Sequence, residues 1–278
     1  MVLDGRKVKS IILDEVRNEV NSLNIKLKLV IIQIGDNESS DIYIKQKINM
    51  CNYVGYNYEC IKLDSDVDID SVLELINNLN NDDLVTGIIV QLPLPSLMDT
   101  DRVINAISPL KDVDCITDYN IIKLLNNKND LAPCTPSGIM ELLDYYNVSV
   151  SGKNVVILGR SRIVGKPLSM MMLSRDATVT VCHSKTKNLC DITKGADILV
   201  SAIGKAKYIS SNMVKRDSIV IDAGISYLGD KLFGDIDYET VFDKVKYITP
   251  VPGGVGPMTV AMVAKNLLKC YKLQKERN

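Results

Sequence analysis

Runs of aliphatic residues alternate along this chain with segments of helical periodicity, and this alternation restricts the possible folds more than any other feature. The first series comprises helices expected over residues 4–23, 39–55 and 71–79 and strands expected over 27–34, 56–63 and 85–92. Strands that alternate with helices are typical of a mostly parallel sheet. We therefore predict an α/β fold for this part of the chain.

A second series of the same kind follows, so we expect two domains, as the length of 278 residues also favours. Its strands are expected over 154–158, 177–182, 197–202 and 218–222, with helices over 136–146, from Pro167 and over 260–273. Thr135 and Pro136 have the residue types of an N-cap and a first helical position. Residues 108–137 form a connector with one short helix near 119–125. The last helix has one apolar face and is expected to pack back on the first domain.

The charge balance excludes whole classes of partner. The chain has 33 basic and 34 acidic residues, a net charge of −1, so no overall field attracts it to nucleic acid or anionic lipid. No apolar run reaches the roughly 18 residues of a membrane span, and residues 1–20 lack the apolar core of a signal peptide. We expect a cytoplasmic protein that binds neither nucleic acid nor membranes.

Cysteine and histidine usage limits the chemistry. The seven cysteines are odd in number and form no Cys-x-x-Cys pair, so we expect reduced, mostly buried thiols rather than disulfides or a zinc site. His183 is the only histidine, which excludes a histidine-rich metal site, and we predict no bound metal. Proton transfer is therefore expected from a lysine, a tyrosine or a carboxylate.

A glycine-containing turn follows the strand expected over 154–158. It runs from Gly159 to Pro167 and leads into a helix, which places backbone N–H groups and the positive helix end where a phosphate can bind. The spacing differs from Gly-x-Gly-x-x-Gly, because five residues separate the two glycines, and a tight turn without a ligand is the alternative.

The residues around this turn favour NADP over NAD. An NAD site usually has an Asp or Glu about 20 residues after the turn, where this chain has His183-Ser184-Lys185. Ser184 and the guanidinium of Arg160 would instead suit the additional phosphate of NADP. A solvated loop is the alternative for Arg160 and the other basic residues of the turn.

Tyr43 and Lys47 are four residues apart and so share a face of the expected helix, which Met50 and Val54 continue. A core tyrosine beside a surface lysine is one interpretation of this pair. The other is a functional pair, because a lysine among buried groups favours its neutral form and can then act as a base.

Three further segments carry polar or constrained residues. Gln91 ends an apolar strand at the sheet edge where open α/β folds bind ligands. Asp112 and Asp114 belong to the connector and form either a solvated turn or a recognition site for a heterocycle rich in N–H groups. The glycine- and proline-rich segment 249–259 would let a ligand approach the backbone closely before the last helix begins.

Six motifs in these regions carry a family resemblance that extends over essentially the whole chain. They are residues 40–47 (SDIYIKQK), 90–95 (VQLPLP), 111–114 (KDVD), 133–138 (PCTPSG), 159–167 (GRSRIVGKP) and 252–259 (PGGVGPMT). In these ordered motifs the sequence resembles the bifunctional methylenetetrahydrofolate dehydrogenase/methenyltetrahydrofolate cyclohydrolase family.

The resemblance implies roles for particular residues. Lys47 would be the general base, and Gln91 would orient and tune it. Tyr43 would stack on the folate ring and Asp114 would bind the pterin, which completes the expected catalytic group. Further substrate contacts are expected at Pro252, Gly253, Gly254 and Thr259, and cofactor contacts at Gly159, Arg160, Ser161, Ser184, Gly224 and Ile225.

The resemblance also implies an architecture and a reaction. Two α/β domains would flank a cleft, and the chain would cross between them twice. Residues 1–138 with 258–278 would bind folate, and residues 139–257 would form a Rossmann-like NADP-binding domain through which the protein is a homodimer. NADP would oxidise 5,10-methylenetetrahydrofolate to a methenyl cation, which is then hydrolysed to 10-formyltetrahydrofolate. A neutral lysine base suits this cation, because an ammonium would repel it.

Two residues depart from the family pattern. Cys115 stands where a glycine is common after the second aspartate, and Ser226 stands where asparagine is usual after Gly224-Ile225. Cysteine adopts a positive φ less readily than glycine does, which bears on the backbone beside Asp114.

Two other function classes fit part of these observations. A dehydrogenase without the hydrolase step would keep the glycine turn but lack Lys47. A non-catalytic dinucleotide-binding regulator would not need Lys47, Gln91 and Asp114 together, and it would bind a cofactor without turnover.

Overall fold

The computed structural model describes residues 1–229 and 231–276, which fall into two compact units. Unit 1 comprises Met1–Ser10 and Thr135–Thr259, and unit 2 comprises Ile11–Cys134 and the residues from Val260 onward. Each unit contains a parallel sheet, so the predicted α/β class with two domains is confirmed. Among the described residues, no helix is both long and apolar enough to cross a membrane.

The first ten residues belong to unit 1, so the chain passes between the two units three times. Leu3 N donates to Ile248 O at 2.8 Å, and Gly5 N donates to Gly253 O at 2.9 Å. A Cβ atom at Gly5 would overlap the carbonyl of Gly254. These contacts join the N-terminal residues to the segment that precedes the last helix.

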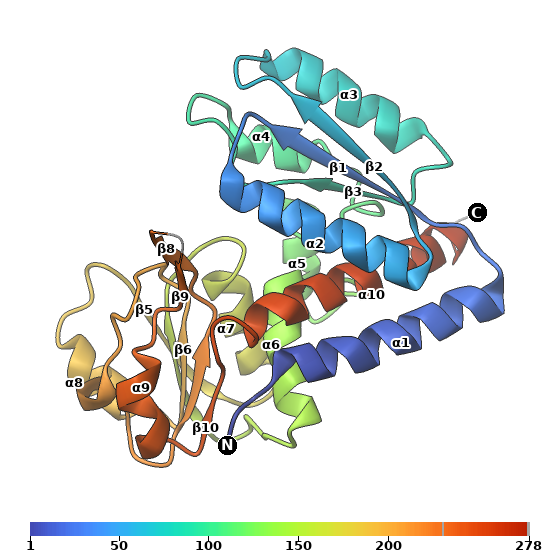
Figure 1. Cartoon of the computed structure of the whole chain (residues 1–278). Coiled ribbons are helices and arrows are strands. Elements are labelled where there is room, and N and C mark those ends of the chain that lie inside the picture. The colour runs from blue at the N-terminus through green and yellow to red at the C-terminus, as the bar shows by residue number, and fades with distance from the viewer. Residues whose placement is uncertain (230, 277–278) are drawn as a thin grey trace. The chain divides into compact units, whose positions relative to one another are not determined.

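Unit 2 is built on a three-stranded parallel sheet in the order β2-β1-β3. Its elements are β1 (Lys28–Ile34), α2 (Glu38–Val54), β2 (Asn57–Leu63), α3 (Ile69–Asn81), β3 (Gly87–Val90), α4 (Thr100–Asn105) and α5 (Asp118–Leu125), with α1 (Gly5–Leu23) from Ile11 onward and α10 (Val255–Glu276) from Val260 onward. Val30, Ile32 and Ile34 of β1 pack with buried residues of α3 and α4. Successive residues of a strand point to opposite faces, and Figure 1 shows α2 on the other face of this sheet from α3.

The last helix packs on unit 2, as predicted. Tyr56 OH donates to Ala264 O at 3.1 Å, Asn266 Nδ2 donates to Val113 O at 2.8 Å, and Gln274 Nε2 donates to Thr86 O at 2.8 Å. These bonds fix α10 to segments that lie far from it in the sequence.

Unit 1 contains a five-stranded parallel sheet in the order β10-β7-β6-β4-β5. Its elements are α6 (Cys134–Tyr145), β4 (Asn154–Leu158), α7 (Gly165–Leu173), β5 (Thr178–Cys182), α8 (Leu189–Lys194), β6 (Ile198–Ser201), the 3-10 turn η1 (Ser211–Met213), β7 (Ile219–Asp222), the antiparallel pair β8 (Ser226–Leu228) and β9 (Lys231–Phe233), α9 (Tyr238–Val241), the 3-10 turn η2 (Phe242–Lys244) and β10 (Tyr247–Ile248).

Both faces of the unit 1 sheet are covered. Val155 and Ile157 of β4 belong to a core shared with α6 and α7. Val156 and Leu158 belong to a second core, with residues of α8 and α9. A parallel sheet buried on both faces explains why its strands read as continuous aliphatic runs.

Several helix starts differ from their predictions. Helix α2 begins at Glu38 rather than at residue 39, and its N-cap Asn37 accepts a hydrogen bond from Ser40 N at 3.0 Å. Helix α6 begins at Cys134, which places Thr135 and Pro136 inside its first turn. The short helices α4, α8 and α9 and the β8–β9 pair were not predicted, because so few residues carry little periodicity.

Candidate active site

A buried lysine amine lies at the centre of the candidate site in unit 2. Lys47 is only 5% exposed, and its Nζ donates to Gln91 Oε1 at 3.1 Å. Asp114 Oδ2 lies 3.9 Å from the same Nζ, beyond direct hydrogen-bond distance. Three residues that are far apart in the sequence are thus brought together, while the amine has one close acceptor.

Helix α2 places Lys47 at this position. The helix begins at its Asn37 cap and ends at Gly55, which has φ +85° and whose N–H bonds to Cys51 O. Tyr43 lies one turn before Lys47 on the same face of α2 and is partly buried. The shared face predicted for this pair is thus present, and Lys47 is a buried residue rather than a surface one.

The side chain of Gln91 is oriented by its own second hydrogen bond. Gln91 directly follows β3, and its backbone N donates to Ile32 O at 2.8 Å. Its Nε2 donates to Leu92 O at 2.9 Å, which leaves Oε1 directed at Lys47. A carbonyl oxygen can only accept, so it binds one N–H of the lysine and leaves the lone pair of a neutral amine available.

Asp112 shapes the loop that carries Asp114. Its carboxylate accepts from Ile116 N at 3.2 Å, Thr117 N at 2.9 Å and Asn120 Nδ2 at 2.9 Å. Burial raises the pKa of Asp112, and the hydrogen bonds from Thr117 and Asn120 oppose that rise. Of the two interpretations given for the connector carboxylates, neither describes Asp112, which is 1% exposed and holds its own loop.

Cys115 adopts φ +55°, the backbone conformation that glycine takes more readily. It is fully buried inside the loop that Asp112 closes. The departure from the family pattern therefore leaves the left-handed turn in place. Cys134 lies beside the same loop, with Sγ 3.4 Å from Val113 O. Burial and the neighbouring Asp114 raise the pKa of its thiol, which stays neutral.

The glycine turn of unit 1 is held by two close backbone approaches. Gly159 has φ +112°, and a Cβ there would lie 2.5 Å from Ala202 O. A Cβ at Gly165 would overlap the carbonyl of Gly159. Both positions therefore require glycine, and the carboxyl end of β4 turns sharply into α7.

Three N–H groups at the start of α7 have hydrogen-bond partners within the turn. Ser161 Oγ accepts from Val164 N at 3.2 Å and from Gly165 N at 3.3 Å, and Lys166 N donates to Ser161 O at 3.1 Å. Arg160 and Ser161 are exposed. Anion binding at this turn would therefore depend on side chains such as the Arg160 guanidinium.

The other predicted cofactor residues follow neighbouring strands of the same sheet. Ser184 is exposed in a tight turn after β5, where His183 N donates to Thr186 Oγ1 at 2.8 Å. Gly224 and Ile225 follow β7. The carboxyl ends of parallel strands share one edge of a sheet, which is where open α/β folds bind their ligands.

Gly253 and Gly254 of segment 249–259 lie against other parts of the chain, whereas nothing lies within 4 Å of a Cβ built at Gly256. The main chain of Gly253 and Gly254 packs on Gly5, and Gly254 N donates to Pro250 O at 2.8 Å. Helix α10 begins at Val255, inside this segment. Thr259 Oγ1 lies 3.0 Å from Thr135 Oγ1. The predicted substrate residues Pro252, Gly253, Gly254 and Thr259 belong to unit 1, whereas Lys47 belongs to unit 2.

Two buried carboxylates beside Gly224 were missed by sequence reasoning. Asp222, at the end of β7, is 3% exposed, and Asp235 is fully buried. Burial raises the pKa of Asp222 to about 7; hydrogen bonds from Ile236, Asp235 and Gly224 oppose the rise, and the charge of Asp235 adds to it. An Asp at a strand end followed by Gly, with a second Gly-Asp downstream, was the available signal.

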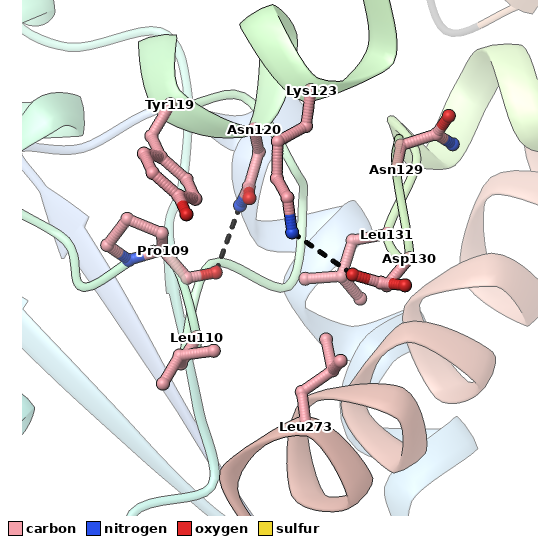
Figure 2. A pocket seen from close by; sticks show the side chains of 9 residues that line it. All are labelled: Pro109, Leu110, Tyr119, Asn120, Lys123, Asn129, Asp130, Leu131 and Leu273. Atoms are coloured by element: carbon pink, nitrogen blue, oxygen red, sulfur yellow. Dashed lines mark hydrogen bonds and ion pairs between the residues drawn. The ribbon is translucent and has the colours of Figure 1, made fainter. Parts of the chain in front are cut away.

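Figure 2 shows a pocket that is lined by residues of unit 2. Leu110, Leu131 and Leu273 are among its lining residues, and its charged groups Lys123 and Asp130 pair with each other at 3.1 Å. None of the predicted catalytic residues lines it. It therefore adds no reactive group to the candidate site.

Two family models cover most of the chain. The catalytic domain of tetrahydrofolate dehydrogenase/cyclohydrolase matches residues 3–114, and the NAD(P)-binding domain of the same family matches residues 133–275. The chain belongs to the tetrahydrofolate dehydrogenase/cyclohydrolase family. The resemblance drawn from six motifs is thereby confirmed.

Relatives of this family match the chain from end to end. The bifunctional protein FolD of Acholeplasma laidlawii is 49% identical over 276 residues, which cover 99% of this chain and 100% of that protein. The crystal structure of the bifunctional FolD enzyme from Campylobacter jejuni matches with a TM-score of 0.95 and 41% identity, over 99% of both chains. The Trypanosoma brucei FolD structure, complexed with NADP cofactor and inhibitor, matches with a TM-score of 0.96 and 34% identity, over 99% of this chain and 98% of that one.

The residues of this tetrahydrofolate dehydrogenase/cyclohydrolase fit a bound dinucleotide. In the glycine turn, the main chain approaches other main chain closely at Gly159 and Gly165, and Arg160 and Ser161 between them are exposed. Ser226, which follows Gly224-Ile225, has a buried hydroxyl without a hydrogen-bond partner among the described residues. A buried polar atom without a partner is costly unless a ligand or water satisfies it.

We predict that Asp222 makes stability depend on pH. Its pKa is about 7 in the native state against an ordinary value of 3.8, so between these values the native chain holds a proton that the unfolded chain has released. This contribution is complete below about pH 4 and is lost as the pH rises through about 7, and a rise of roughly 3 in pKa corresponds to about 4 kcal/mol.

In urea unfolding, the free energy of wild type minus that of Asp222→Asn should therefore fall between about pH 4 and pH 7 and stay level above that range. The difference is compared rather than the wild-type curve alone, because other carboxyls titrate in the same range. A difference that does not change with pH would contradict the assignment.

Proposed function

We propose that the chain oxidises 5,10-methylenetetrahydrofolate to the 5,10-methenyl cation with NADP and then hydrolyses that cation to 10-formyltetrahydrofolate. The observation that carries the proposal is the buried Lys47 amine, which is bonded to Gln91 Oε1 in a chain whose family models name both activities. Among the rivals considered, a dehydrogenase alone or a non-catalytic regulator would leave this arrangement without a use.

Lys47 acts as the general base in the hydrolysis. Water is a weak nucleophile, so addition to the methenyl carbon is faster when a base removes its proton. The positive charge of the substrate repels an ammonium and so favours the neutral amine of Lys47. Gln91 orients that amine with its carbonyl oxygen, which accepts one N–H bond from Nζ.

Asp114 and Tyr43 bind the folate ring in this proposal. The Asp114 carboxylate, which is 24% exposed, accepts hydrogen bonds from the N–H groups of the pterin. Tyr43 supplies a partly buried ring one helical turn from Lys47, against which the folate ring stacks. Pro252, Gly253, Gly254 and Thr259 supply further substrate contacts.

Unit 1 binds the dinucleotide along the carboxyl ends of β4, β5 and β7. When bound, NADP accepts the hydride released by the methylene carbon. Gly159, Arg160, Ser161 and Ser184 contact its phosphate and ribose groups, and Gly224 and Ile225 contact its nicotinamide end. The division into a folate-binding and an NADP-binding domain then follows units 2 and 1. Seven free cysteines support a reducing compartment, the cytoplasm.

Lys47→Met tests the base. In wild type, mixing the protein with 5,10-methylenetetrahydrofolate and NADP should give absorbance of NADPH and then 10-formyltetrahydrofolate. The variant keeps the chain length without an amine, so hydrolysis of supplied methenyltetrahydrofolate should fall by about 10² to 10⁴ while NADP binding persists. Lys47→Arg should not restore the rate, because a guanidinium stays protonated.

Lys45→Met is the matched control, because Lys45 is exposed on the same helix and should be silent. Hydrolysis by Lys47→Met within a few-fold of wild type would refute the base. NADPH without a formyl product would leave a dehydrogenase alone, and cofactor binding without turnover would leave a regulator.

Arg160→Ala tests the cofactor preference. A charge-assisted contact to the additional phosphate contributes about 1.5 to 3 kcal/mol, so wild type should show a higher kcat/KM with NADP than with NAD. The variant should lose most of this preference by losing activity with NADP, with little change for NAD. Equal kcat/KM for both cofactors in wild type would contradict the prediction.

We predict that the protein forms a homodimer through unit 1. Strand β5 ends the five-stranded sheet and is paired only with β4 among the described residues, whereas β10 at the other edge is bridged by Val2. An open strand edge can pair with a second copy. Light scattering at micromolar protein and physiological salt should give about twice the 30.8 kDa of one chain. A mass near that of one chain would exclude the dimer.

A further inference from the structure

Asp235 holds the loop that follows β6. Its fully buried carboxylate accepts from Ser201 Oγ at 2.8 Å, Ile203 N at 2.8 Å and Lys205 N at 2.7 Å. Ser201 is the last residue of β6, so the three donors follow the chain as it leaves the sheet. The direction of this loop is therefore set by one carboxylate that lies 30 to 34 residues away in the sequence.

Asp222 holds the segment that follows β7, the neighbour of β6 in the sheet. It accepts from Gly224 N at 3.0 Å, and from the backbone N of Asp235 and Ile236 at 3.0 Å and 2.8 Å. The backbone of Asp235 is thus bound by Asp222, while the side chain of Asp235 binds the β6 loop. The two carboxylates form a chain of contacts across two strand ends.

The two glycines beside these carboxylates are required for space. A Cβ at Gly224 would overlap the carboxylate of Asp235, and a Cβ at Gly234 would overlap the carboxylate of Asp222. Neither glycine has a positive φ, so backbone conformation is not the reason for its residue type. The carboxylate of Asp235 therefore lies directly against the main chain of Gly224, and the carboxylate of Asp222 lies against the main chain of Gly234.

Two neighbouring buried carboxylates disfavour each other's ionised form, and apolar side chains of similar size often serve stability as well or better. Each carboxylate instead accepts three hydrogen bonds, and these bonds orient the backbone of both loops. Hydride transfer depends strongly on orientation, because a misplacement of about 1 Å can lower a rate by about 10².

We propose that Asp222 and Asp235 are positioning residues for hydride transfer, which hold Gly224–Ile225 and the loop 203–205 where the nicotinamide end of the dinucleotide binds. The inference rests on the proposed function, which supplies the dehydrogenase step and the nicotinamide contact. It adds two residues that touch neither substrate nor cofactor and act through the backbone.

Asp235→Asn tests the proposal. The amide NH₂ would face a backbone N–H that the carboxylate now accepts, so one of the loop's bonds is lost. We expect the dehydrogenase kcat at saturating NADP to fall about tenfold or more. The KM for NADP should change less than about threefold, because the Arg160 and Ser184 end of the site is unaltered.

Hydrolysis of supplied methenyltetrahydrofolate without NADP is the internal control, because it needs no hydride transfer, and it should stay within about twofold of wild type. The matched control is Asp237→Asn, two residues further on, where the carboxylate forms a surface ion pair with Lys207 at 3.7 Å. It should leave both activities within about twofold of wild type.

Ser201→Ala decides the question if Asp235→Asn does not fold, because it removes one donor and keeps the carboxylate with its two backbone donors. It should lower the dehydrogenase kcat by about threefold or more, with hydrolysis unchanged. A folded Asp235→Asn or Ser201→Ala with wild-type dehydrogenase kcat overturns the proposal, as does an equal loss of both activities. Wild type that fails to reduce NADP overturns the proposed function as well.

Discussion

The hydrogen bond between Lys47 Nζ and Gln91 Oε1 is the interaction on which the unit 2 site depends. A lysine that is 5% exposed has lost most of its water, so the protein must supply a partner for its amine. Helix α2, which is capped at Asn37 and Gly55, carries the Lys47 amine. Strand β3 ends at Val90, so Gln91 directly follows it and its Oε1 reaches that amine. Without either element, a buried polar group would be left unsatisfied.

The members of this site could be predicted from the sequence, because their signals are local. A spacing of four residues relates Tyr43 to Lys47, and Gln91 interrupts the end of an aliphatic run. The role of Asp112 could not be predicted, since its donors come from Ile116, Thr117 and Asn120 and depend on a left-handed turn at Cys115. A sequence pattern typical of a solvated turn does not indicate that donors later in the same loop bind the Asp112 carboxylate.

The strands of unit 1 could also be predicted, because each is a run of aliphatic residues between polar turns. The contacts that shape its loops could not. The glycines near residue 253 suggested room for a ligand, yet the group that needs the room is the main chain of Gly5. Gly224 and Gly234 resemble turn glycines, but their residue type follows from carboxylates that approach from another segment. Contacts between distant residues leave no periodic trace in the sequence.

The hydrogen bonds at each buried polar group distinguish Lys47, the proposed base, from side chains that hold backbone segments. Lys111 is about as buried as Lys47, but its Nζ donates to two carbonyls, Leu79 O at 3.0 Å and Asp82 O at 2.7 Å. The carboxylates of Asp112, Asp222 and Asp235 each accept three hydrogen bonds. These side chains hold backbone segments in place. Among the described residues, the Lys47 amine has one hydrogen-bond acceptor, Gln91 Oε1, with the Asp114 carboxylate 3.9 Å away, and none of its contacts holds a backbone segment in place.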